Sequence, residues 1–336
     1  MKKTALVCGA GGFIGGHLVN RLLKEGYKVV SVDIKYPSNW FQTRNMDWYA
    51  ACDLRDKSEV DGLFKRTKFD EVFQLAAKMG GAGFIFTGKN DADVMHDSAL
   101  INLNILEAIK TYCPEAKVFY SSSACVYPEF NQMDPQNPIC SEDSAYPAQP
   151  DSEYGWEKLF SERLYMAYHR NYGIDVRIAR FHNIYGPNGT YDGGKEKAPA
   201  AMLRKAIEYR THRKEFEIWG TGEQTRSFLY IDDCIDAVRL LMERSVSLTD
   251  VVNIGSEEMV TINELARLAC KATFPIGTDI PEFKHIDGPL GVNGRVSDNT
   301  LIKKYLDWEP KVSLREGMER TGQWIYRQMV PEPTPI

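Results

Sequence analysis

Short apolar runs alternate with amphipathic stretches through the first half of the chain. Buried strands are predicted over residues 5–8, 28–33, 72–76, 117–121 and 174–181. Between the first two runs, apolar residues from Ile14 to Leu23 recur at helical spacing, and Gly26 is predicted to end that helix. Further helices are predicted over 102–111 and 153–170. Alternating strands and helices are typical of a Rossmann-type α/β fold with a doubly wound parallel sheet.

The second half of the chain has a different pattern. Glycine and proline gather between residues 186 and 194, which predicts a loop-rich insert rather than a further strand–helix–strand unit. Regular patterns return with a strand predicted over 251–254 and a helix starting near Thr261. We therefore expect a main domain over 1–180, a smaller, interleaved C-terminal α/β domain over 181–330 and a loose tail over 331–336.

Charge and composition narrow the classes of partner. The net charge of -5 and the lack of a basic run argue against nucleic acid. No apolar run approaches the roughly 20 residues that a membrane span needs, and the apolar N-terminal stretch stops at glycines, unlike a signal peptide. The seven cysteines are scattered, without a C-x-x-C pair or two histidines at metal-binding spacing. We therefore expect a cytoplasmic protein with reduced thiols and no metal site.

A glycine motif follows the first predicted strand and opens the first predicted helix. Gly9, Gly12 and Gly15 permit a tight turn and a close backbone approach, which places a pyrophosphate on the helix N-terminus. Asp33 ends the second strand, where a carboxylate binds the ribose hydroxyls of NAD and repels the 2′-phosphate of NADP. Lys35, nearby, weakens this preference through its opposite charge. The predicted cofactor is NAD, and the other residues predicted to contact it are Phe13, Ile14, Asp53 and Leu54.

A second set of residues carries hydride-transfer chemistry. Tyr154 and Lys158 are four residues apart on a predicted helix and therefore share a face. An ammonium beside a phenol favours the phenolate and lowers the phenol pKa from about 10. Such a phenolate takes the proton of a sugar hydroxyl while NAD takes the hydride, and Ser123 would share the hydrogen bond to that hydroxyl. Tyr-x-x-x-Lys is frequent by chance, so its weight comes from Ser123 and the glycine motif together.

Taken together, the motifs resemble those of a known family. The chain resembles extended short-chain dehydrogenase/reductases that act on nucleotide sugars, and within them the branch that epimerises GDP-mannose at C3 and C5. The segments that carry the resemblance are Met79-Gly80-Gly81, Ser123-Ala124-Cys125 and residues 181–187, 193–199, 224–228 and 294–299. The resemblance implies that residues 1–180 mainly bind NAD and that 181–330 mainly bind the nucleotide sugar. It also implies a homodimer that pairs the helices near Asn102 and Tyr154.

The same resemblance implies how a sugar would be inverted at two carbons. Oxidation of a hexose at C4 gives a ketone, which acidifies the C–H bonds at C3 and C5. Inversion then needs one group to remove a proton from one face and another to deliver a proton to the other. Cys125 and Lys197 fit these roles, and the resemblance assigns them so. The predicted catalytic residues are therefore Ser123, Cys125, Tyr154, Lys158 and Lys197.

The resemblance also implies which residues hold the substrate. Lys205 and Arg295 are the expected contacts of the two phosphates, which call for cationic side chains. The other expected contacts are Gly80, Ser123, Cys125, Asn183, Glu196, Lys197, Ala198, Gln224, Thr225 and Arg226. Lys78 departs from the family pattern, in which an aspartate is expected.

Three alternative interpretations stay open. A 4,6-dehydratase of the same family would place an Asp-Glu pair after the active-site serine, whereas Cys125-Val126 stands here. A simple 4-epimerase needs no acid–base pair beyond the tyrosine and would not depend on Cys125. A catalytically idle NAD-binding protein of the same fold is the third, which the intact Ser123, Tyr154 and Lys158 disfavour.

Overall fold

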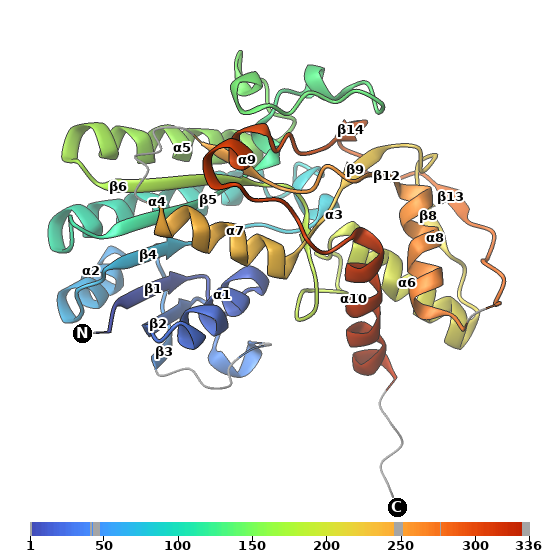
Figure 1. Cartoon of the computed structure of the whole chain (residues 1–336), viewed down its shortest axis with the longest axis horizontal. Coiled ribbons are helices and arrows are strands. Elements are labelled where there is room, and N and C mark those ends of the chain that lie inside the picture. The colour runs from blue at the N-terminus through green and yellow to red at the C-terminus, as the bar shows by residue number, and fades with distance from the viewer. Residues whose placement is uncertain (1, 41, 43–47, 245–250, 276, 331–336) are drawn as a thin grey trace, which may run out of the picture.

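A seven-stranded parallel sheet forms the centre of the protein (Figure 1). The computed structural model describes residues 2–40, 42, 48–244, 251–275 and 277–330. The strand order is β11-β6-β5-β4-β1-β2-β3, so the chain starts mid-sheet, builds outward to β3, and returns to β4 on the other side of β1. The strands are β1 (Thr4–Cys8), β2 (Lys28–Asp33), β3 (Trp48–Ala51), β4 (Glu71–Gln74), β5 (Lys117–Ser123), β6 (Asp175–Phe181) and β11 (Val252–Ile254). This topology confirms the predicted Rossmann-type, doubly wound sheet.

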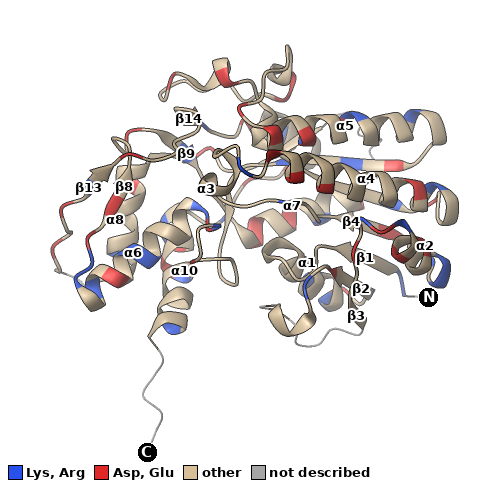
Figure 2. Cartoon of the chain, turned by 180° about the vertical axis from the view of Figure 1, so that it is seen from behind, with Lys and Arg blue, Asp and Glu red and all other residues tan. Residues whose placement is uncertain are grey.

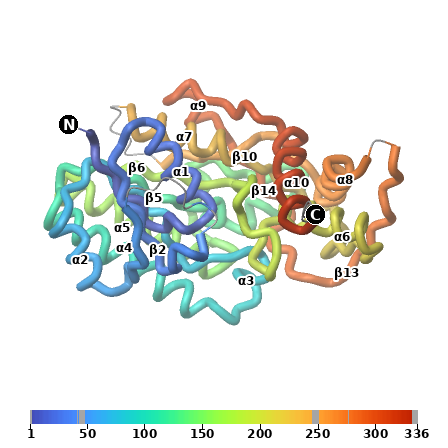
Figure 3. Tube along the Cα trace, turned by 90° about the horizontal axis from the view of Figure 1, so that it is seen from below, coloured from blue at the N-terminus to red at the C-terminus, as the bar shows by residue number. Residues whose placement is uncertain are grey.

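Helices cover both faces of this sheet (Figures 1 and 3). One face carries α1 (Phe13–Lys24), α7 (Ile231–Glu243) and α9 (Thr300–Leu306), and the other carries α2 (Lys57–Arg66), α4 (Asp91–Tyr112) and α5 (Glu153–Tyr172). The alternation of side chains along β1 produces this arrangement, because Ala5 and Val7 join one apolar core and Leu6 and Cys8 join the other.

A second lobe lies beside the carboxyl ends of the strands, where Figure 3 shows α6, α8 and α10 grouped at one end of the molecule. It contains α6 (Ala198–His212), α8 (Ile262–Thr273), α10 (Leu314–Met329), β8 (Glu217–Trp219) and β13 (Lys284–Ile286). Leu203, Leu265 and Met318 of this lobe belong to the same core as Val7 and Val252 of the sheet. The two lobes therefore share one hydrophobic core.

The chain crosses between the lobes several times. After the predicted boundary at residue 180, α7, β11 and α9 return to the central sheet. Short strands line the junction: β7 (Ile184–Tyr185) pairs with β10 (Leu229–Tyr230), and β9 (Thr225–Ser227) pairs with β12 (Met259–Thr261) and β14 (Gly294–Arg295). The predicted tail, 331–336, lies outside the described residues.

One helix differs from the sequence-based expectation. The helix predicted over 102–111 begins earlier, at Asp91, and the buried polar residue Ser98 interrupts the apolar periodicity of the part that the pattern did not predict. Asn102 bonds to Gln74 and to groups on α5, so a polar position faces the interior. The region predicted as loop-rich between residues 186 and 194 forms neither helix nor strand, and it leads into α6, which starts after Lys197 with a proline in its first turn.

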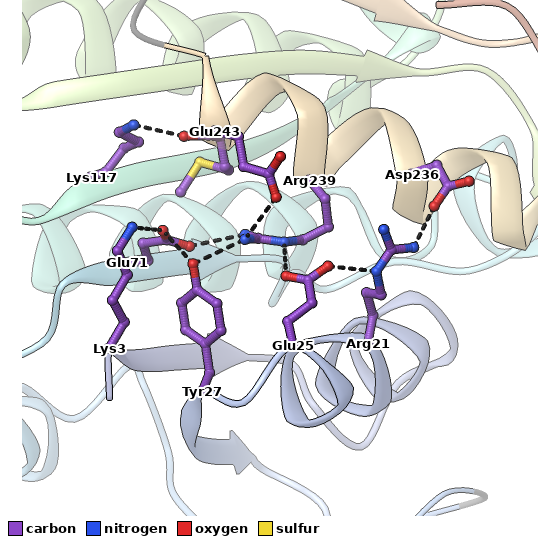
Figure 4. Close-up of polar contacts among 10 residues, drawn as sticks. Lys3, Arg21, Glu25, Tyr27, Glu71, Lys117, Asp236, Arg239 and Glu243 are labelled. Carbon is purple, nitrogen blue, oxygen red and sulfur yellow. Dashed lines mark hydrogen bonds and ion pairs between the residues drawn. The ribbon is translucent and has the colours of Figure 1, made fainter. Parts of the chain in front are cut away.

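A buried ion cluster ties α7 to the amino ends of the strands (Figure 4). Arg239 is 2% exposed, and its guanidinium contacts Glu25 at 2.8 Å, Glu71 at 2.9 Å and the Tyr27 hydroxyl at 3.0 Å. Glu71 begins β4 and also lies 3.4 Å from Lys3. The cluster thus fixes α7 at the end of the sheet opposite to the carboxyl ends of the strands.

Acidic and basic residues are interspersed on α2, α4 and α5, as Figure 2 shows. Among the described residues, no helix is both long and apolar enough to cross a bilayer. The same residues contain no group of three or more His, Cys, Asp or Glu side chains suited to hold a metal ion.

Candidate active site

The glycine turn between β1 and α1 has the geometry of a dinucleotide cradle. Gly9 has a φ of +81°, and a Cβ at Gly15 would lie 2.2 Å from the Gly9 carbonyl oxygen, so both positions require glycine. Gly12 caps α1 without a side-chain hydrogen bond, and the first turn of that helix carries no acidic residue. The N–H groups and dipole at this helix end therefore suit a pyrophosphate.

Asp33 lies beside this turn at the end of β2. Its carboxylate accepts hydrogen bonds from the Gly11 backbone N–H at 3.1 Å and from the Lys35 backbone N–H at 3.0 Å. The Lys35 side chain is exposed, while Asp33 is buried at the carboxyl end of its strand. These residues fit NAD, because the carboxylate is fixed where the ribose hydroxyls of a dinucleotide lie.

The other predicted cofactor residues have contacts of their own within the protein. Asp53 forms an ion pair with Arg55 at 2.7 Å, and Arg55 also contacts Asp97 at 2.9 Å. Leu54 is buried, and its carbonyl accepts a hydrogen bond from Asn104. Phe13 and Ile14 are half-buried at the start of α1, where the Phe13 ring borders Gly186 and Gly189.

Lys78, the departure from the family pattern, turns toward α4. Its ammonium lies 3.6 Å from the Asp97 carboxylate, and its backbone N–H donates to the Ser98 hydroxyl at 3.0 Å. Asp97 thus joins Lys78 to Arg55. The extra positive charge is therefore paired within the protein, in the same ion-pair network as Asp53, a predicted NAD contact.

The predicted redox residues converge where β5 ends and α5 begins. Ser123 closes β5, and a short 3-10 helix, η2 (Ala124–Val126), follows it. A Cβ at Gly155 would lie 2.1 Å from the Cys125 carbonyl oxygen, so the first turn of α5 packs directly on η2. Lys158 donates to the Ser121 carbonyl at 2.9 Å and lies 5.7 Å from the centre of the Tyr154 ring.

Burial dominates the electrostatics of this pair. It raises the pKa of the Tyr154 phenol, and the negative charges of Cys125 and Glu157 raise it further, whereas the hydrogen bond with Ser123 lowers it. Burial also lowers the pKa of the Lys158 ammonium, and Glu157 acts against that change. The sequence-based expectation of a phenol pKa lowered by Lys158 is therefore not met in the protein alone, because desolvation of the phenolate outweighs the nearby ammonium.

Cys125 and Lys197 come from segments on opposite lobes and lie close enough to interact electrostatically. Cys125 is half-buried, whereas the other six cysteines are buried and all seven are free. Lys197 caps α6, and burial lowers the pKa of its ammonium, Cys125 raises it and Arg295 lowers it. A Cβ at Gly81 would lie 2.5 Å from the Glu196 carbonyl oxygen, so the Gly80-Gly81 segment packs against the segment that carries Lys197.

Two predicted substrate residues lie near this pair: Glu196 precedes Lys197 in the chain, and Arg226 interacts electrostatically with Cys125. Glu196 accepts from Arg204 at 3.2 Å through Oε1, while its buried Oε2 has no hydrogen-bond partner among the described residues. Arg226 donates to the carbonyls of Leu290 at 3.1 Å and Val292 at 2.7 Å, and burial and then Arg295 lower its pKa to about 10.

Most of the remaining predicted substrate residues donate hydrogen bonds to backbone carbonyls. Asn183 donates to the Ser227 carbonyl at 2.9 Å, Lys205 to the Glu217 carbonyl at 2.7 Å, Gln224 to the Trp219 carbonyl at 3.2 Å and Thr225 to the Pro135 carbonyl. Ala198 opens α6, and a Cβ at Gly80 would lie 2.6 Å from the Phe84 Cβ. Lys205 and Gln224 thus donate hydrogen bonds to β8 of the second lobe.

Two residues of this site, Asp151 and Gln132, were not predicted from the sequence, and both contact Arg295. Arg295 donates to Cys125 Sγ at 3.2 Å, to Gln132 at 2.6 Å and to Asp151 at 2.9 Å. Asp151 stands two residues before α5, so its sequence position is that of an ordinary helix-start acid. Gln132 lies in the short helix η3 (Glu129–Gln132), where no motif marks it.

His182 is buried and bonds to a neighbouring side chain. Its Nε2 lies 2.9 Å from Asn253 Oδ1, which also accepts from the Tyr127 hydroxyl at 2.6 Å. Burial lowers the pKa of His182 to about 3, so the ring is neutral at physiological pH.

A dinucleotide cradle at the centre of a parallel sheet, with a serine, tyrosine and lysine gathered at the end of β5, defines a Rossmann-type enzyme that oxidises and reduces a hydroxyl group. Residues 5–255 match the model of the NAD dependent epimerase/dehydratase family, and the chain belongs to that family. The predicted resemblance and the predicted NAD cofactor are thereby confirmed.

Individual relatives cover nearly the whole chain. GDP-mannose 3,5-epimerase of Arabidopsis thaliana is 43% identical over 330 residues, which span 97% of this chain and 83% of that protein. GDP-mannose 3,5-epimerase 1 of Oryza sativa subsp. indica is 43% identical over 334 residues, which span 99% and 84%.

Solved structures show the same architecture. A UDP-glucose 4-epimerase of Thermotoga maritima, with UDP-glucose, superposes with a TM-score of 0.81 at 27% identity, covering 97% of this chain and 99% of that one. A UDP-glucuronic acid 4-epimerase of Bacillus cereus, in complex with UDP-glucuronic acid and NAD, gives a TM-score of 0.80 at 27% identity with the same coverage.

Proposed function

We propose that this protein is an isomerase that epimerises GDP-mannose at C3 and C5, giving GDP-L-galactose and GDP-L-gulose through a transient 4-keto sugar. The observation that carries the proposal is the half-buried Cys125 thiol, which lies two residues beyond the end of β5 and interacts electrostatically with Lys197. The 43% identity to GDP-mannose 3,5-epimerases over almost the full length supports the choice of substrate.

The oxidation step uses Ser123, Tyr154 and Lys158. When bound, NAD supplies a reversible hydride acceptor for C4. Tyr154 accepts the proton of the C4 hydroxyl, and Ser123, which lies near the phenol at the end of β5, shares that hydrogen bond. Burial opposes the phenolate, so Lys158, which lies 5.7 Å from the Tyr154 ring, supplies positive charge where the phenolate forms.

The exchange step uses Cys125 and Lys197. The thiolate of Cys125 removes a proton from the carbon next to the ketone on one face of the ring, and the ammonium of Lys197 delivers one to the other. The lowered pKa of Lys197 suits this role, because an acid whose pKa lies nearer to neutrality releases its proton more readily. A single pair serves both carbons, since C3 and C5 flank the same ketone.

The substrate is held by the second lobe and by the Gly80-Gly81 segment. Gly80 permits a close approach to the sugar, and the unpartnered Oε2 of Glu196 suits a sugar hydroxyl. Lys205 and Arg295 bind the diphosphate. The remaining substrate contacts are assigned to Asn183, Ala198, Gln224, Thr225 and Arg226, and the residues that border NAD are Gly9, Gly12, Phe13, Ile14, Gly15, Asp33, Asp53 and Leu54.

A homodimer in the cytoplasm completes the proposal. Leu103 of α4 and Trp156 and Phe160 of α5 are 41%, 40% and 48% exposed on two helices that pack side by side. Such apolar side chains on adjacent helices suit pairing with the same face of a second copy. Light scattering on a size-exclusion column should give twice the chain mass, and Phe160→Glu should shift it to the monomer; a monomeric wild type would refute the dimer.

Product analysis tests the function. The purified protein is incubated with GDP-mannose and NAD, and the GDP-hexoses are separated by anion-exchange chromatography, with UDP-glucose as the matched control substrate. New GDP-hexose peaks from GDP-mannose support the proposal. Conversion of UDP-glucose with GDP-mannose unchanged would instead favour a 4-epimerase, in which Cys125 has no role.

A further inference from the structure

Arg295 is anchored on three sides by protein groups. Its Nη1 donates to Cys125 Sγ at 3.2 Å, its Nη2 to Asp151 at 2.9 Å and its Nε to Gln132 at 2.6 Å. The side chains of Arg295 and Asp151 are 7% and 5% exposed, and Gln132 is fully buried. A planar guanidinium held at both Nε and Nη2 has a fixed orientation, so its third contact, to the sulfur, is set by the other two.

Close backbone packing around β14 and around η2 brings Arg295 and Cys125 together. Arg295 ends β14, which pairs with β9 at Arg226, and a Cβ at Gly294 would lie 2.9 Å from the Asp134 carbonyl oxygen. Gly155 lets α5 pack on the backbone of Cys125, which brings Asp151 beside η2. Arg295, from a strand at the junction of the two lobes, thereby contacts Cys125, which follows β5 of the central sheet.

We infer that Asp151 and Gln132 are positioning residues of the proton-exchange centre, which hold the Arg295 guanidinium against Cys125 so that its charge stabilises the thiolate. The catalytic importance of that thiolate rests on the proposed function. The contacts themselves do not, and Arg295 keeps further N–H groups with which to meet a phosphate.

Other titratable groups also lie near the thiol, and their charges determine the direction of the expected change. The groups that interact electrostatically with Cys125 or with Arg295 are Tyr154 and Lys158 of α5, Lys197 before α6, His182, Arg226 of β9, Cys140 and Asp151. Asp151 is itself negative. Acting through its charge alone, it would oppose the thiolate, whereas acting through Arg295 it favours the thiolate.

Titration of thiol alkylation separates these two roles. Carbamidomethylation of Cys125 by iodoacetamide is followed by mass spectrometry between pH 5 and 10, without nucleotide sugar; the other six cysteines are buried, and Cys125→Ala gives the background. The midpoint is the pH at which the alkylation rate is half of its maximum. Asp151→Ala should raise this midpoint by about one pH unit, which corresponds to a roughly tenfold loss of rate at pH 7. Arg295→Gln should move it at least as far. An unchanged or downward midpoint in the Asp151 variant would overturn the inference.

Gln132→Ala provides an independent test, because it releases Arg295 without changing any charge. Its midpoint should also move upward, and an unchanged midpoint would contradict the inference even if the Asp151 variant failed to fold. Asp143→Ala, an exposed carboxylate in η4 (Glu142–Ala145), is the matched control and should match the wild type. The alkylation is measured without nucleotide sugar, so it does not depend on the proposed function. If the midpoints shift as expected but GDP-mannose is not converted, the proposed function alone is refuted. If GDP-mannose is converted but the midpoints do not shift, this inference alone is refuted.

Discussion

Arg239→Met tests the buried ion cluster that joins α7 to the central sheet (Figure 4). The substitution removes a guanidinium that is 2% exposed and contacts both Glu25 and Glu71. Glu71, whose side chain is 4% exposed, then keeps its contacts to the exposed Lys3 at 3.4 Å and to the Tyr27 hydroxyl at 2.9 Å. A buried carboxylate would thus lose its strongest partner.

The expected cost is large for one residue. Removing one partner of a buried ion pair destabilises proteins by about 3–5 kcal/mol, against a total stability of about 5–15 kcal/mol. The double variant Arg239→Met with Glu71→Leu removes both charges, so it should recover most of this loss. Arg315→Met, in an ion pair whose arginine is 82% exposed, is the matched control and should change stability by less than about 1 kcal/mol.

Urea unfolding, followed by circular dichroism at pH 7, measures these differences. Epimerase activity of the folded single variant should stay close to wild type at low temperature, because the cluster lies at the end of the sheet opposite to the site. A loss below about 1 kcal/mol in Arg239→Met, or a double variant no more stable than the single one, would refute the reasoning.

Three further predictions concern the site and its surroundings. Cys125→Ala should lower epimerisation by about 100-fold or more while leaving NAD bound, with Cys113→Ala as the unaffected control; product formation near the wild-type rate would contradict the assignment. Gly15→Ala places a Cβ 2.2 Å from the Gly9 carbonyl oxygen, so calorimetry should show NAD affinity weakened by about tenfold or more, and an unchanged Kd would argue against the cradle. Native His182, with its pKa lowered to about 3, binds fewer protons than the unfolded chain, so its contribution to stability is lost as pH falls below about 6.5. Between pH 7 and 5 this amounts to about 2 kcal/mol, which urea unfolding should show in the wild type and not in His182→Phe; equal pH dependence in the two proteins would disprove it.

The fold could be predicted because its signals are local. Ala5, Leu6, Val7 and Cys8 form one short apolar run, and such runs recur between amphipathic stretches, which is sufficient for a parallel sheet covered on both faces. The glycine turn could be predicted for the same reason, since the strand, the turn and the helix are contiguous in sequence.

The remaining features depend on contacts between distant segments. The first turns of α4, from Asp91, were not predicted, because their buried polar residue Ser98 finds its partner, the Lys78 backbone N–H, in the folded chain alone. Arg295 was assigned to the diphosphate from its motif, whereas its contact to Cys125 is made across 170 residues of sequence. Asp151 and the raised pKa of Tyr154 were missed for the same reason, since burial is a property of the assembled site.

Proton NMR of GDP-mannose incubated with the protein and NAD in D₂O tests the central claim most directly. Two-centre epimerisation predicts that deuterium enters at both C3 and C5 and that the signals of new GDP-hexoses appear. Protium retained at both carbons would contradict the proposed function. Exchange at C5 alone would contradict the assignment of one Cys125–Lys197 pair to both carbons.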